Sequence, residues 1–430
     1  METPRPHESA ARSAARQRLV GRAVGAIAPP RLGSSFRWLL AATFINNAGD
    51  GVVVAAGPLL VASQTHDPFL VSLALLSEYL PALLFGVIGG VAADRFDRRR
   101  MVVVVNLIRA AVLAVLVATI VSGTVDIAVV LVTLFALGTA ETFADSASST
   151  LIPSLVGRAD LGLANARMQG AFLLVNQLVG PPIGAFLFAV GMALPFATNA
   201  AAFALGAVLI SRVTVSTTQL AGGPGSFGAE MAEGIRWLAG HPPMRTLALT
   251  ILTFNVTYGA AWSVLVLYAT QRLGMDAVGF GLLTTAVAVG GLIGAAIYGA
   301  LERRFSLADI MRVGLLIETF THLTLALTTA AAVALAILVV FGAHAFVWGT
   351  TSTVVRQRAV PLELMGRVTG VYRVAIVGGL VIGTPLGGLL ASAFGITAPF
   401  WFAFAGSALL VTLLWRQFEH ITHAEAPLPA

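Results

Sequence analysis

Long runs of apolar residues alternate along the chain with short polar stretches. Each run holds about 20 residues or more, enough for a helix to cross a hydrocarbon core of about 30 Å. Six runs precede a polar, glycine-rich stretch and six follow it. The pattern predicts an all-α polytopic membrane protein with twelve transmembrane helices in two six-helix halves. The predicted spans are 37–62, 69–93, 101–122, 125–151, 163–190, 192–212, 244–270, 276–301, 307–329, 331–355, 367–393 and 397–417.

The arginines support this assignment. Of the 26 basic residues, all arginine, only Arg272 lies in a loop on one side, and Arg109 and Arg373 lie inside spans; the other 23 share the opposite side. Basic residues collect on the cytoplasmic side of membrane proteins. We therefore expect a plasma (inner) membrane protein with both termini in the cytoplasm. The predicted parts are a tail at 1–36, a first bundle at 37–212, a linker at 213–243, a second bundle at 244–417 and a tail at 418–430.

The composition removes other classes of protein. Hydrophobic residues make up 57% of the 430 residues and charged residues 11%, against about 25% charged in a soluble domain. The chain has no cysteine and no lysine. These absences exclude disulfides, cysteine-bound metals, a P-loop lysine and Schiff-base chemistry. We expect no cofactor and no metal. The net charge of +6 reflects topology, so we expect a lipid bilayer as partner and no nucleic acid.

The two halves repeat each other. Asp94-Arg95 after the second span matches Glu302-Arg303 after the eighth, 208 residues later. Pro153 matches Pro361 at the same offset, and the segment 180–184 matches 383–387 at an offset of 203. Repeats of the same topology are related by an axis along the membrane normal. They predict a substrate site near the midplane, between the halves.

The loop after the second span carries the motif Gly90-Val91-Ala92-Ala93-Asp94-Arg95-Phe96-Asp97-Arg98-Arg99. It resembles the signature loop of the major facilitator superfamily, although Asp97 stands where a second glycine is usual. The resemblance covers the whole chain and implies a twelve-helix transporter. It also implies a conformational latch, in which the Asp94 carboxylate meets the start of the eleventh span near 366–368. The dipole of a helix favours negative charge at its N-terminus. A generic basic loop is the alternative. The candidate latch residues are Gly90, Asp94, Arg95, Arg98 and Arg99 in this loop, together with Gly180, Pro181 and Gly184 in the fifth span.

A second motif lies in the fifth span. Gly180-Pro181-x-x-Gly184 resembles the antiporter signature of the same superfamily, with Ala185 in place of a further glycine. Small residues allow close helix contact and prolines interrupt backbone bonding, so we expect a bend or seal. The resemblance favours export over import.

Two further segments resemble the branch of enterobactin exporters and macrolide efflux proteins. They are the opening of the fifth span at 163–166 and the segment 233–238 before His241-Pro242. In the second segment Trp237 and Leu238, with Met231 and Ile235, predict a short amphipathic helix on the inner leaflet.

Five carboxylates lie inside predicted spans, where a charge costs roughly 2.5–3.5 kcal/mol even on a lenient scale. Asp50 is the first candidate for proton coupling because it lies about 20 Å along its helix from Arg37, in a polar turn. A structural partner role is the alternative, since Arg109 and Arg373 are able to satisfy two of the five. Glu78 and Glu318, with His322 nearby, receive no assigned role.

Glu141 and Asp145 share one face of the fourth span, since they are four residues apart. They are expected to attract a cationic substrate, share a proton or bind Arg109. Many relatives carry an arginine in this span where Leu134 stands here. The resemblance thus puts the usual relay in doubt or shifts it to Arg109. The candidate proton-coupling residues are Asp50, Glu141, Asp145 and Arg109.

Polar and aromatic side chains at helical spacing are candidates for the substrate site, with helix packing as the alternative. They occur on the first, fifth, seventh and tenth spans: Asn46, Asn47, Phe172, Asn176, Gln177, Asn255, Tyr258, Trp262, His344 and Trp348.

The sequence thus predicts a monomeric secondary transporter that exchanges protons for a drug-like or natural-product small molecule. An importer or facilitator on the same fold is the alternative, and the latch motif permits it equally. A membrane enzyme is a third class, for which no nucleophile, metal or histidine motif is present. The identity of the substrate does not follow from these residues.

Overall fold

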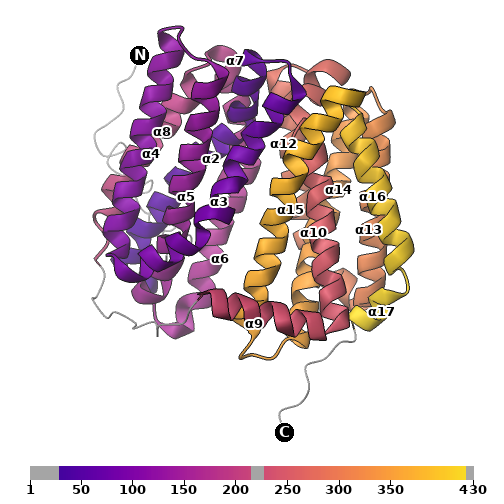
Figure 1. Cartoon of the computed structure of the whole chain (residues 1–430). Coiled ribbons are helices and arrows are strands. Elements are labelled where there is room, and N and C mark those ends of the chain that lie inside the picture. Colours follow the sequence, from indigo (N-terminus) through magenta and orange to yellow (C-terminus); the bar gives the residue numbers. More distant parts are fainter. Residues whose placement is uncertain (1–28, 215–226, 423–430) are drawn as a thin grey trace, which may run out of the picture.

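The computed structural model describes residues 29–214 and 227–422, with the side chains of Pro30, Asp94, Phe227 and Thr422 outside the description. Two helical bundles stand side by side (Figure 1), the first indigo to magenta and the second red to yellow. The first bundle contains η1 (Pro30–Leu32), α2 (Gly33–Gln64), α3 (Pro68–Arg95), α4 (Arg98–Val121), α5 (Ile127–Leu155), η2 (Arg158–Asp160), α6 (Leu161–Ala171), η3 (Phe172–Val179), α7 (Gly180–Val190) and α8 (Leu194–Ile210).

The helix α9 (Phe227–Gly240) runs across the lower end of the second bundle (Figure 1). That bundle contains α10 (Pro242–Trp262), α11 (Leu265–Leu267), η4 (Tyr268–Arg272), α12 (Ala277–Arg304), α13 (Leu307–Leu327), α14 (Ala331–Ala359), α15 (Met365–Phe394), α16 (Ala398–Leu414) and α17 (Gln417–Thr422).

Nine helices of the described chain are long and apolar enough to span a membrane, counting Arg158–Val190 as one. The pair Pro242–Trp262 and Leu265–Arg272, bent by 42°, makes a tenth candidate. The 17-residue apolar helices α8 and α16 fall on the predicted sixth and twelfth spans. At about 1.5 Å per residue, 17 residues lie at the short end of the range for a spanning helix.

Several helices begin at a capping side chain that the sequence supplies locally. The carboxylate of Asp97 accepts from the Arg100 backbone N–H at 2.8 Å, which explains an aspartate where the related loops carry glycine. Such caps satisfy one of the free N–H groups of the first turn. The caps of α3, α5, α12 and α13 are Asp67, Asp126, Asp276 and Ser306.

The fifth span is not a regular helix. Between α6 and α7 its backbone forms the π-helical segment η3, which ends at Val179, two residues before Pro181. A proline has no N–H to donate to the carbonyl four residues earlier, so the preceding turn widens. The expected interruption of backbone bonding is therefore present as a π segment.

The two halves pack their glycine motifs in equivalent ways. A Cβ added at Gly180 would overlap the α2 backbone at Gly51, and a Cβ added at Gly184 would overlap it at Val52. In the second half, Gly383 and Gly387 lie in the same way on the α10 backbone at 256 and 260. Only glycine permits these backbone contacts. The repeat read from the sequence thus corresponds to a repeated helix contact.

The halves meet at the end of the bundle away from α9. Ser392 donates to Asp67 across the halves at 3.3 Å, and Gly281 of α12 lies on Pro181 and Ala185 of α7. One apolar core includes residues of both halves there. Towards α9, the described residues form two further cores, each within one half. The two halves are therefore joined at one end.

Candidate functional site

Arg109 of α4 is the centre of a charged cluster in the first half. It is buried, and its Nη2 lies 3.2 Å from Asp50 Oδ1 of α2 and 3.6 Å from Glu141 Oε2 of α5. Its guanidinium also stacks over Phe203 of α8, 4.0 Å from the ring centroid. One cation therefore ties four helices together. Pairing with an arginine was the alternative for Asp50 and one of the three expectations for Glu141; proton coupling by either carboxylate stays a prediction.

Asp145 and Glu78 extend this cluster. Asp145 lies one turn beyond Glu141 and is within electrostatic range of Arg109 and of Arg373 from the other half. Glu78 of α3 is exposed, and its carboxylate lies within range of electrostatic repulsion from those of Asp50 and Glu141. We call Asp50, Glu78, Glu141 and Asp145 the acidic cluster. Glu78 had no assigned role because a single sequence does not show which way α3 is rotated.

Asparagines surround Asp50 and fill helix contacts, and the Asn199 side chain is also within hydrogen-bonding range of the Asp50 carboxylate. The Oδ1 of Asn46 occupies the space that a Gly206 side chain would take, and Asn199 of α8 does the same at Gly49. Asn47 donates to the Thr43 carbonyl of its own helix at 2.8 Å. The structure thus places Asn46 between α2 and α8. The buried amide of Asn106, one turn before Arg109, has no hydrogen-bond partner among the described residues and was not anticipated.

The candidates of the fifth span lie in the π segment. Gln177 donates to Asn176 Oδ1 at 2.8 Å, and the Asn176 backbone lies against Gly51, next to Asp50. Phe172 is partly exposed. The widened turn therefore brings the Asn176 and Gln177 side-chain amides close to the polar turn of α2. Phe172 lies about one turn earlier, at the start of the π segment.

The second half carries a row of stacked rings. On α10, Tyr258 stacks on Trp262 with ring centroids 4.3 Å apart, and Phe254 stacks on Trp348 of α14 at 6.0 Å. Phe341 lies 4.7 Å from Trp262 and completes the row. These residues form the aromatic row. Three predicted substrate residues therefore lie together: Tyr258, Trp262 and Trp348.

The other two candidates of this half point elsewhere. Asn255 donates to the Ile251 carbonyl at 2.8 Å and packs against Gly379 of α15. His344 of α14 bonds Glu318 of α13 through Nε2 at 3.0 Å. Glu318 also bonds His322 Nε2, at 2.8 Å, and all three side chains are buried.

The sequence did not predict this arrangement of one carboxylate between two imidazoles. Glu318 and His322 are four residues apart on one helix, but His344 comes from the next, and only the packing of α13 on α14 joins them. When Glu318 is ionised its carboxylate only accepts bonds, and both Nε2 atoms then donate to it. No group of three or more His, Cys, Asp or Glu within 29–214 and 227–422 is arranged to hold a metal ion.

The latch residues lie at the cytoplasmic end predicted for the first bundle. Arg98 donates to the Ala93 and Thr150 carbonyls at 3.3 and 3.4 Å, and Arg99 donates to the Ser211 carbonyl. Gly90 has open space around it and Arg95 is exposed. The side chain of Asp94 lies outside the described residues, so the latch stays a prediction.

The start of the eleventh span has another carboxylate partner. Glu233 of α9 bonds Arg367 at 2.7 Å, and Gly234 packs on the Arg367 carbonyl. The predicted amphipathic helix is therefore attached to α15. Its Leu238 is buried in the core of the second half, whereas Ile235 is exposed.

Comparison with known proteins identifies the family of this chain and several of its relatives. Residues 24–427 match the family described as transmembrane secretion effector. The multidrug efflux pump Tap of Mycolicibacterium fortuitum is 30% identical over 383 residues, covering 84% of this chain and 90% of that protein. The enterobactin exporter EntS of Shigella boydii is 24% identical over 392 residues, covering 84% and 89%.

A solved structure has the same fold. The nucleoside transporter NupG superposes with a TM-score of 0.71 at 11% identity, covering 91% of this chain and all of that one. The predicted fold class is confirmed: an all-α polytopic membrane protein with the major facilitator fold. It is a transporter fold and not that of an enzyme. The chain belongs to the transmembrane secretion effector family of the major facilitator superfamily.

Proposed function

We propose that this protein is a proton-coupled transporter that exports drug-like or natural-product small molecules across the plasma membrane, with both termini in the cytoplasm. The observation that carries the proposal is the bond of one buried arginine, Arg109, to both Asp50 and Glu141. Glu78 and Asp145 add two further carboxylates. Arg109 and the exposed Arg373 are two guanidiniums for four carboxylates, so protons or a cationic substrate supply the remaining charge.

The cycle follows from competition for Arg109. A proton that enters from outside neutralises Asp50, weakens its bond to Arg109 and leaves the guanidinium to Glu141. Substrate release accompanies this step. Loss of the proton to the cytoplasm restores the Asp50–Arg109 pair and the state that binds substrate. Arg109 contacts α2, α5 and α8, so a change of partner alters the packing of the first half.

The joined end of the halves supports alternating access. The fifth and eighth spans touch where Pro181 and Ala185 meet Gly281, on the side away from α9. If α9 lies on the inner leaflet, as its amphipathic pattern predicts, the described state is closed to the outside. Opening it requires the contacts at Gly281 and between Asp67 and Ser392 to separate.

The aromatic row is the proposed contact for the apolar part of the substrate. Its rings come from α10 and α14 of the second half, and the acidic cluster lies in the first half. An amphipathic cation bound between the halves would thus meet rings on one side and carboxylates on the other. The relatives named for multidrug efflux and enterobactin export support outward direction.

Transport into everted membrane vesicles tests the proposal, with Hoechst 33342 as the probe because its fluorescence falls on leaving the bilayer. We expect an acid-inside proton gradient to drive faster loss of fluorescence in vesicles containing the protein than in empty-vector vesicles. Collapse of the gradient should remove the difference. Accumulation in right-side-out vesicles instead would reverse the direction and favour an importer. Equal rates in protein and vector vesicles under every gradient would refute the proposal.

A further inference from the structure

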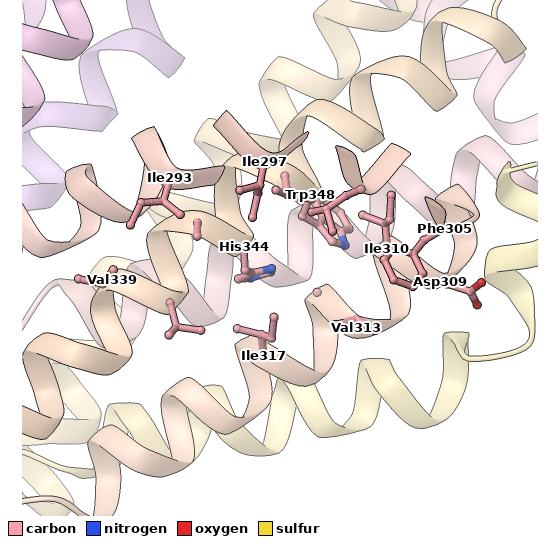
Figure 2. A pocket seen from close by; sticks show the side chains of 15 residues that line it. Ile293, Ile297, Phe305, Asp309, Ile310, Val313, Ile317, Val339, His344 and Trp348 are labelled. Atoms are coloured by element: carbon pink, nitrogen blue, oxygen red, sulfur yellow. The ribbon is translucent and has the colours of Figure 1, made fainter. Parts of the chain in front are cut away.

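A groove of 480 Å³ lies between α12, α13 and α14 (Figure 2). None of its lining residues belongs to the acidic cluster. Both α12 and α13 pack on α14 but contact each other little, so α14 forms the floor. Its walls are almost wholly aliphatic, and they include Ile293, Ile297, Val313 and Val340.

The groove opens towards the bilayer. Those four wall residues are between 41% and 52% exposed, although each lies within a long apolar helix. Apolar side chains exposed at this depth in a membrane transporter contact lipid. The rim near Leu301, Phe305 and Asp309 lies at the end of α12 that carries Arg303 and Arg304. The groove thus occupies the half of the bilayer predicted to be cytoplasmic.

Two polar side chains stand at the inner wall of this apolar groove. His344 and Trp348 line it, one turn apart on α14 (Figure 2). Both residues are more than nine-tenths buried, and His344 Nδ1 and Trp348 Nε1 have no hydrogen-bond partner among the described residues. Gly314 of α13 makes room for them: a Cβ there would stand 2.7 Å from Trp348 Cδ1 and 3.1 Å from His344 Nδ1.

The bonding capacity of this pair is defined by chemistry. An indole N–H only donates, so Trp348 requires an acceptor. His344 Nε2 bonds Glu318; in the neutral tautomer that donates from Nε2, Nδ1 is left as an acceptor. A lipid acyl chain offers neither group, and filling the groove with one would leave both polar atoms unpaired in hydrocarbon.

We propose that this groove binds membrane-dissolved, largely apolar small molecules that carry a hydrogen-bond acceptor next to a donor, as an amide or a benzimidazole does. The apolar body lies on α14 between α12 and α13. The acceptor takes the Trp348 N–H, and the donor faces His344 Nδ1. Both atoms are buried in the described state, so the proposed binding requires each of them to become accessible from the groove.

The same indole connects the groove with the aromatic row. Trp348 stacks on Phe254 of α10 with nearly parallel rings, 5° apart. A molecule held against Trp348 is therefore one ring away from the proposed substrate contact. The site supplies substrate from the cytoplasmic half of the bilayer, and this role, unlike the binding itself, rests on the proposed function.

Equilibrium binding of Hoechst 33342, which carries paired benzimidazole N and N–H groups, tests the site. The full chain is placed in phosphatidylcholine nanodiscs, and fluorescence in empty nanodiscs is subtracted. We expect saturable binding that Trp348→Phe weakens about tenfold through loss of one hydrogen bond. The matched control Trp401→Phe, at an exposed tryptophan of α16, should stay within about twofold.

A second pair of variants tests the groove without touching its buried wall. Val340→Trp fills the groove from an exposed position of α14, whereas Val333→Trp adds the same bulk to the same helix outside it. We expect only Val340→Trp to lower affinity by more than about tenfold. Elution as a single species confirms that each variant is folded.

Three results would overturn the inference. One is no saturable binding to the wild type, and another is wild-type affinity in both Trp348→Phe and Val340→Trp. The third is a phospholipid that native mass spectrometry finds on the wild type but not on Val340→Trp, and that Hoechst 33342 does not displace. If the wild type shows proton-driven transport and the groove variants bind with unchanged affinity, the groove site is refuted and the proposed function is not. If the groove binds Hoechst 33342 but the protein transports nothing, the proposed function is refuted and the groove site is not.

Discussion

Arg109 Nη2 lies 3.2 Å from Asp50 Oδ1, which joins the first and third spans of the first half. The arginine side chain is 6% exposed and the aspartate 23%. The pair therefore lies between a closed helix interface and a space that protons can reach. Asp50 is adjacent to Gly51, on which Gly180 packs, so the pair borders the contact between α2 and α7.

Neutralising Asp50 should separate coupling from binding. In Asp50→Asn we expect loss of proton-driven transport, because the amide neither carries a proton nor pairs with Arg109 as a charge. Substrate binding should remain within a few-fold, since the aromatic row is unchanged. Vesicle transport and nanodisc binding of Hoechst 33342 measure the two effects. Normal proton-driven efflux in this variant would show that another group carries the coupling.

A double-mutant cycle should detect the Asp50–Arg109 pair. Arg109→Met leaves Asp50 and Glu141 without their cation, and we expect it to destabilise the protein more than Asp50→Asn does. The two changes together should cost less than their sum, with a coupling of about 0.5–3 kcal/mol. Thermal unfolding in detergent measures each variant. Additive effects would mean that the pair contributes nothing to stability.

The Gly184 contact should not accept a side chain. A Cβ at Gly184 would overlap the Val52 carbonyl, so Gly184→Val must push α7 from α2. We expect most of the folded, monodisperse protein to be lost. The control is Gly378→Ala, at a helical glycine with nothing within 4 Å, which should be neutral or slightly stabilising because alanine favours helix. Equal yields of Gly184→Val and wild type would contradict the contact.

Removing the charge of Glu318 should destabilise the second half. Glu318 is fully buried between His322 and His344, and Glu318→Gln removes an acceptor from one of the two imidazoles. We expect a loss of about 3 kcal/mol or more, read as a lower unfolding temperature. His322→Ala should cost less than this because Glu318 keeps its bond to His344. The reverse order would show that His322, not Glu318, holds the cluster together.

Much of the fold follows from local sequence. The long apolar runs predicted the positions of the spans, and the Asp97 and Asp126 caps begin helices where the apolar runs begin. Pro181 and Pro182 predicted the interruption of the fifth span, which takes the form of η3. These features depend on residues a few positions apart, so the sequence alone contains the physical cause.

The site follows the sequence less closely. Asp50, Glu141 and Arg109 were recognised one by one because a charge in an apolar run is visible on its own. The sequence left open which carboxylates Arg109 bonds, and it gave Glu78 and Glu318 no role. The pairing depends on how each helix is rotated about its axis, and rotation is decided by contacts with other helices.

The sequence by itself determined that the chain crosses a membrane, in two similar halves, and that few charged groups remain inside. Hydrophobic length, helix caps and repeated glycine motifs are sufficient for that. Only the tertiary structure decided that Arg109 binds Asp50 and Glu141, that Glu318 lies between two histidines, and that Asn46 turns towards Gly206. Each of these contacts joins residues on different helices, and their positions result from packing the whole bundle at once.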